Sequence, residues 1–133
     1  MSGLILTITL VTGASFRQST ALSSGAASMG VILRSQQAYR LENNIFAPKI
    51  KLLDARLDYT DYVYAIVQSS TKQFIAKAIP KSPKLQSYAG GGLQNGEQFT
   101  VILCESNKPQ KRIVLPYIRK GTWFCGVDSH PLQ

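Results

Sequence analysis

Residues 33–48 read LRSQQAYRLENNIFAP, and this stretch contains both the end of a helix and the start of a different kind of structure. Most of residues 34–43 are good helix formers. The pair Asn43 and Asn44, followed by the breaker Pro48, is typical of a helix stop. The sequence therefore predicts a helix that ends near Asn43.

Upstream of this stop, a helical pattern runs back to Arg17 without a proline. Its apolar residues recur at steps of four, three and four, which places them on one helical face. They are Leu22, Ala26, Met29 and Leu33. Most of residues 23–30 are Ser, Gly or Ala, and each Gly costs about 1 kcal/mol relative to Ala. Packing must therefore stabilise this helix.

Before Arg17, residues 1–16 (MSGLILTITLVTGASF) carry no charge. The stretch is short for a membrane-spanning helix, which needs about 20 apolar residues, and it lacks the early Lys or Arg of a secretory signal. We interpret residues 1–20 as the apolar part of one long helix that continues to Asn43, for a membrane or filament core, and residues 21–133 as a globular head. The alternative is a buried strand or core helix of a soluble domain. The apolar side chains are Leu4, Ile5, Leu6, Ile8, Leu10 and Val11.

After Pro48 the pattern alternates, as in strands. Runs rich in aromatic and β-branched residues predict strands at 62–67, 73–79 and 99–104. Gly90 to Gly92 is interpreted as a breaker and Asn95-Gly96 as a turn, and residues 105–133 as loop-like. The amphipathic half of the helix can cover one face of such a sheet, which predicts an α+β fold with a helix on a small antiparallel sheet.

The composition limits the class of protein. The 133 residues suffice for one domain, and the hydrophobic fraction of 44% against 17% charged excludes a disordered chain. Fifteen Lys and Arg against seven Asp and Glu give a net charge of +8, which favours anionic partners.

The chain contains two cysteines, Cys104 and Cys125. They lack the neighbouring ligands of a four-ligand zinc site and the spacing of a CxxC redox motif. A disulfide is favoured, and two unrelated thiols remain the alternative. A disulfide that closes a loop of about 20 residues would stabilise the fold by about 3 kcal/mol and would indicate an oxidising compartment.

The sequence argues against an enzyme. The only histidine, His130, follows Asp128 and Ser129 directly, and adjacent residues in a tail do not hold the geometry of a catalytic triad. The Gly90 to Gly92 run lacks the spacing of a phosphate-binding loop. Asp54, Asp58 and Asp61 are too irregular for a calcium loop, and solvated surface charge is the favoured interpretation. We expect no cofactor, no metal and no small-molecule substrate.

A basic segment lies between the two cysteines. Three aromatic residues, Tyr117, Trp123 and Phe124, accompany its charges, a combination used by single-stranded nucleic-acid sites. Three interpretations remain open: a solvated loop whose aromatics anchor it to the core, a DNA-binding loop, and a loop that binds acidic polysaccharide. The basic residues are Lys108, Lys111, Arg112, Arg119 and Lys120.

Four stretches carry a resemblance to a known family. Residues 33–48, 58–67 (DYTDYVYAIV), 78–91 (AIPKSPKLQSYAGG) and 99–109 (FTVILCESNKP) resemble cyanobacterial type IV pilins and the related pilin-like G and H proteins, in the same order. The likeness covers roughly residues 20 to 125. It implies a pilin-like fold whose C-terminal loop is closed by a disulfide, with Cys104 and Cys125 at the matching positions.

The resemblance also implies a function. The chain would be a structural subunit, major or minor, of a type IV pilus or a secretion pseudopilus, with other pilin subunits as partners. It would be anchored in the inner membrane before assembly and lie at the cell surface afterwards. The leader-peptidase junction of pilins is absent from the sequence, and we expect Met1 to be an internal methionine. The alternative is a soluble periplasmic or extracellular binding module with an apolar leader.

Overall fold

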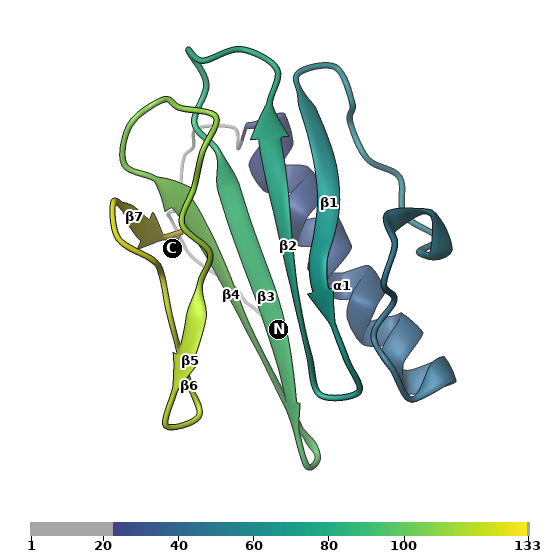
Figure 1. Ribbon diagram of the computed structural model, residues 1–133. Helices are drawn as coiled ribbons and strands as arrows, with labels where there is room; N and C mark the ends of the chain where they lie inside the picture. Colours follow the sequence, from purple (N-terminus) through teal and green to yellow (C-terminus); the bar gives the residue numbers. More distant parts are fainter. Residues whose placement is uncertain (1–22, 133) are drawn as a thin grey trace, which may run out of the picture.

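A computed structural model describes residues 23–132 of the chain, in which one helix lies against one face of an antiparallel sheet (Figure 1). The α+β class is confirmed. The elements are α1 (Ser24–Asn43), the short 3₁₀ helix η1 (Ile50–Leu52), β1 (Tyr62–Ser69), β2 (Gln73–Pro80), β3 (Tyr88–Asn95), β4 (Gln98–Ser106), β5 (Tyr117–Arg119), β6 (Thr122–Phe124) and β7 (Ser129–Pro131).

Helix α1 ends where the sequence predicts. Asn44 adopts the left-handed conformation, with φ 62°, and its N–H donates to the Arg40 carbonyl, which caps the helix. At the other end Ser23 is extended, and its side chain accepts a hydrogen bond from the Ala26 N–H at 3.1 Å. The helix therefore begins at Ser24, and the predicted continuity with the apolar residues is interrupted at Ser23.

The main sheet contains five strands in the order β1-β2-β3-β4-β7, and every neighbouring pair is antiparallel. The three predicted strands are confirmed as β1, β2 and β4. The interpretation of Gly90 to Gly92 as a breaker is wrong, because these residues lie inside the central strand β3. A turn is confirmed between β3 and β4, one residue later than predicted: Asn95 ends β3, and the two turn residues are Gly96, with φ 63°, and Glu97.

Close packing on both faces of β3 explains these three glycines. A Cβ built on Gly90 would lie 3.1 Å from the Cε of Met29 in α1. One built on Gly91, which faces the other way, would lie 2.6 Å from the ring of Trp123 in β6. The absence of side chains lets the helix approach one face of the strand and the β5–β6 hairpin approach the other.

The core lies between α1 and the sheet. The predicted apolar face is confirmed for Ala26, Met29 and Leu33, which are buried, whereas Leu22 lies outside the described residues. The buried side chain of Gln36 receives a hydrogen bond from the Ala47 N–H at 2.7 Å and donates one to the Ala47 carbonyl at 2.8 Å. These two bonds satisfy both polar groups of the buried side chain. They also hold the segment that follows the helix against α1.

The interpretation of residues 105–133 as loop-like is also wrong. Strand β4 continues to Ser106, β7 pairs with it through Glu105 and His130, and β5 and β6 form a separate two-stranded sheet. Strands of three residues are too short to show an alternating pattern in the sequence.

The six apolar residues predicted to enter a membrane or filament core, Leu4 to Val11, lie outside the described residues. Within residues 23–132, no helix combines the length and apolar character needed to cross a bilayer.

The glycine at position 91 gives a test of this packing. Gly91→Ala places a Cβ against the Trp123 ring and 2.9 Å from the Phe74 carbonyl oxygen, and we expect it to lower the free energy of unfolding by about 1–3 kcal/mol. Gly30→Ala is the matched control. Its Cβ meets only the flexible end of Arg34 at 3.4 Å, and loss of a helical glycine should stabilise by about 0.5–1 kcal/mol. Urea denaturation followed by circular dichroism measures both, and equal stability of the two variants would contradict the packing argument.

Candidate functional site

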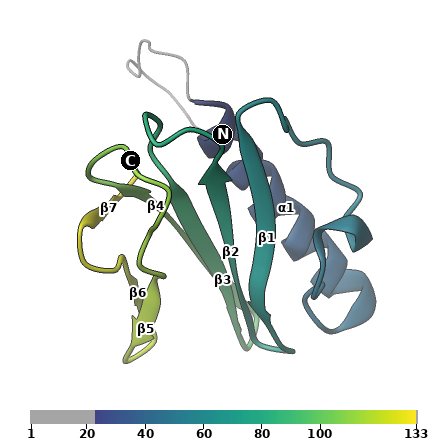
Figure 2. The same cartoon turned by 45° about the horizontal axis from the view of Figure 1, so that its top comes forward.

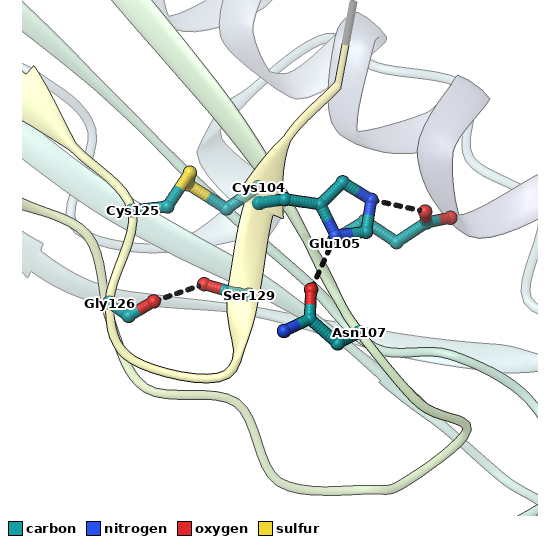
Figure 3. The surroundings of a disulfide bond; sticks show 7 residues. Cys104, Glu105, Asn107, Cys125, Gly126 and Ser129 are labelled. Carbon is teal, nitrogen blue, oxygen red and sulfur yellow. Dashed lines mark hydrogen bonds and ion pairs between the residues drawn. A yellow bond between two sulfur atoms is a disulfide. The ribbon is translucent and has the colours of Figure 1, made fainter.

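The cysteine pair forms a disulfide. Cys104 lies near the end of β4 and Cys125 directly follows β6, with their Cα atoms 5.7 Å apart (Figure 3). The bond ties the β5–β6 hairpin to the main sheet, and Cys104 is fully buried. The preference for a disulfide over two unrelated thiols is confirmed.

The β5–β6 hairpin has two different faces. Its strands are joined by Lys120 and Gly121, both with positive φ, as in a two-residue type I′ turn. Ile118 and Trp123 are cross-strand partners on the inner face, and Trp123 packs against Gly91. The Trp123 Nε1 is buried and has no hydrogen-bond partner among the described residues, so its ring contributes to packing and not to a polar network.

The outer face of the hairpin presents an aromatic and cationic cluster. The rings of Tyr117 and Phe124 stack with centroids 5.7 Å apart, and these residues are 43% and 42% exposed. The Arg119 guanidinium lies 5.7 Å from the Tyr117 ring centroid, within the range of a cation–π contact. We call Tyr117, Arg119 and Phe124 the hairpin cluster; its flat, partly solvated rings beside a cation could stack on a planar ligand.

The five basic residues named from the sequence do not form one surface. All are exposed, but Lys108, Lys111 and Arg112 lie in the loop after β4, whereas Arg119 and Lys120 lie at the far end of the hairpin (Figure 1). Of the three aromatic residues named with them, only Tyr117 and Phe124 face solvent.

A chain of polar contacts links the start of α1 to the last strand. Ser23 Oγ donates to the Tyr88 hydroxyl at 2.8 Å, and that hydroxyl donates to Glu105 Oε2 at 2.8 Å. His130 Nε2 lies 3.0 Å from Glu105 Oε1, and His130 Nδ1 lies 2.6 Å from Asn107 Oδ1 (Figure 3). Burial raises the pKa of Tyr88, which keeps this hydroxyl protonated as a donor.

This geometry does not assemble a catalytic triad from Asp128, Ser129 and His130. Ser129 Oγ donates to the Gly126 carbonyl at 2.7 Å, and the His130 ring contacts Glu105 and Asn107. The pairing of His130 with Glu105 was missed, because it depends on the register between β4 and β7, for which a three-residue strand gives no sequence signal.

No metal-binding cluster is found within residues 23–132, where no group of three or more His, Cys, Asp or Glu could hold an ion. The Asp58 carboxylate accepts the Thr60 N–H at 2.9 Å, and this hydrogen bond is the main reason that its pKa is lowered. A groove of about 340 Å³ lies between α1 and β4, lined by Gly30, Leu33, Arg34, Gln37, Phe99 and Val101.

Removal of the disulfide tests how much the bond stabilises the fold. The double variant Cys104→Ala/Cys125→Ala should lose about 3 kcal/mol of unfolding free energy, since the bond closes a loop of about 20 residues in the unfolded chain. Denaturation of the oxidised wild type, the reduced wild type and the variant measures the loss. A variant as stable as the oxidised wild type would show that the bond adds nothing.

Comparison with known proteins agrees with the sequence resemblance. The family described as type IV pilin-like G and H has a model that matches residues 23–126. This range contains α1, β1 to β6 and both cysteines. No curated protein and no solved structure matches the chain.

Proposed function

The chain belongs to the type IV pilin-like G and H family, and from that membership we propose that it is a structural subunit, major or minor, of a type IV pilus or a type II secretion-like pseudopilus. The family is structural and not enzymatic. The proposal includes assembly with other pilin subunits, anchoring in the inner membrane before assembly, and a final position at the cell surface or in the periplasm.

The exposed side of α1 supports this proposal most directly. A stripe at helical spacing along this side contains only one charged residue, and Leu41 within it is 76% exposed. Solvent-facing sides of helices are normally rich in charge, so an apolar side is suited to contact a neighbouring subunit. The stripe consists of Ala27, Val31, Arg34, Ala38 and Leu41.

A heterologous contact of this kind, repeated from subunit to subunit, generates an open helical filament. The apolar residues 4–11 would add to such a contact, because an uncharged apolar segment requires either lipid or other subunits. In this proposal the sheet and the disulfide-bonded hairpin face outward.

Leu41→Glu tests the filament contact. Because Leu41 is exposed, the substitution should change the unfolding free energy by no more than about 0.5 kcal/mol, yet it places a charge in the proposed contact. We expect fewer surface filaments to be recovered by shearing, while the amount of the protein in the cell stays unchanged. Gln98→Glu, which adds the same charge at the exposed start of β4, is the control. Wild-type filament yield for Leu41→Glu would refute this contact.

Cell fractionation separates the filament subunit from the soluble binding module. A filament subunit should be found with the membranes and in sheared filaments. If the intact protein occurs only in the soluble fraction, the binding module is the better description.

The hairpin cluster supports a second, additional role, namely contact with DNA or acidic surface polymers. Its stacked rings lie beside Arg119 and Lys120, and residues 107–127 contain no acidic residue. Single-stranded nucleic acid fits this combination best, since every base has a face that can stack on an aromatic ring.

Tyr117→Ala/Phe124→Ala tests this role. Loss of stacking costs about 1–3 kcal/mol per base, so the affinity for a single-stranded oligonucleotide should fall about tenfold or more in gel-shift titrations. Wild-type binding should weaken as salt rises. Binding that is unchanged by the substitutions, while an acidic polysaccharide competes for it, would favour the polysaccharide, and an absence of binding would remove this role.

A further inference from the structure

Two loops that are distant in the sequence lie side by side at one end of the sheet. They are residues 81–87, between β2 and β3, and residues 107–116, between β4 and β5. The Gln110 N–H donates to the Leu85 carbonyl at 3.0 Å, and Ser87 Oγ donates to the Arg112 carbonyl at 3.2 Å. These bonds hold the two loops together as one surface.

This surface is strongly basic. The two loops contain five cationic residues and no acidic one. All five are exposed, and none forms an ion pair within residues 23–132, where the only such pair joins His130 and Glu105. The four considered together are Lys84, Lys108, Lys111 and Arg112. We call these four residues the two-loop basic surface.

The neighbouring charges do not neutralise this surface. Lys81, the fifth cation, donates to the Tyr59 carbonyl at 2.6 Å and lies near Asp58, so we leave it out. Glu105 already faces His130 and Tyr88. Asp128 borders the surface, because its carbonyl accepts the Asn107 N–H, and its one carboxylate against four cations leaves three positive charges in excess.

The same end of the molecule holds the start of α1. Ser23 Oγ donates to Tyr88, the first residue of β3, and the Tyr62 hydroxyl donates to the Gln86 carbonyl at 2.7 Å. Figures 1 and 2 both show the beginning of α1 at the same end of the sheet as these two loops. The chain before Ser23 contains the uncharged residues 1–16 and then Arg17. The chain that leads back to the apolar segment therefore leaves the head at the end that carries the basic surface.

We propose that the two-loop basic surface contacts the anionic headgroups of the membrane into which the apolar segment of the same chain inserts. This inference rests on the membrane stage of the proposed function. Lys and Arg near an anionic leaflet strengthen membrane binding about fivefold each, and the effect decays within a Debye length. Nucleic acid fits this surface less well, because neither loop contains an aromatic residue, whereas Tyr117 and Phe124 lie on the hairpin.

Vesicle co-flotation of the full chain tests the proposal. The vesicles are phosphatidylcholine alone, or phosphatidylcholine mixed with phosphatidylglycerol, each at low and high salt. The test variant is Lys84→Gln/Lys111→Gln/Arg112→Gln. The matched control, Lys49→Gln/Lys51→Gln/Lys72→Gln, removes the same charge from exposed residues that lie outside both loops and outside the hairpin. Urea denaturation checks that both variants remain folded.

We expect the wild type and the control to prefer the phosphatidylglycerol vesicles at low salt. The test variant should lose about tenfold or more of that binding while its binding to phosphatidylcholine stays unchanged. An unchanged preference in the test variant, an equal loss in the control, or a wild type that binds both vesicles equally would overturn the proposal and leave the membrane stage intact. Failure of the wild type to float with either vesicle would remove the membrane stage and this inference with it. If the test variant loses binding to single-stranded DNA and keeps its vesicle preference, the surface is a nucleic-acid site and the proposal is wrong.

Discussion

The absence of side chains on three consecutive residues of the central strand is the constraint on which the rest of the head depends. At Gly90 the space is used by Met29 of α1, and at Gly91 it is used by Trp123 of the hairpin. A side chain at either position would push a layer away from the sheet. Because the hairpin docks closely, the Cys104–Cys125 bond can close beside it, and the outer rings of the hairpin are held toward solvent.

The sequence predicts the parts of this fold whose signals are local. The end of α1 follows from Asn43, Asn44 and Pro48, and three strands follow from their alternating residues. The error at Gly90 to Gly92 is informative, because a glycine run is ambiguous between a turn and a strand that other elements approach closely. Only the partners, Met29 and Trp123, distinguish the two, and they lie far away in the sequence. The cap at Ser23 was missed because a helical pattern continues on both sides of it.

The candidate surfaces also combine features that are local in the sequence with features that depend on distant residues. Lys108 and Arg119 are close in the sequence, which led us to predict one basic loop. In the structure Lys108 lies in the loop after β4, whereas Arg119 lies in the hairpin over the ring of Tyr117. Lys84 and Lys111 lie on the same surface, because the hydrogen bond between Gln110 and Leu85 holds their two loops together. The spacing of residues in the sequence does not reveal this contact. The basic residues thus belong to two separate surfaces, of which only the hairpin also carries stacked aromatic rings, and we propose a different partner for each.

The position of Trp123 has a practical consequence. It is the one tryptophan in the chain, and it lies between the hairpin and β3, whereas Tyr62 and Tyr88 lie on the helix side of the sheet. Its fluorescence therefore reports whether the hairpin is docked. Four of the six tyrosines belong to the core beneath α1 or pack against it, so the tyrosine signal mainly reports the packing of that layer. The protein contains an intrinsic pair of optical probes that can show whether its two layers separate together or one after the other, without any added label.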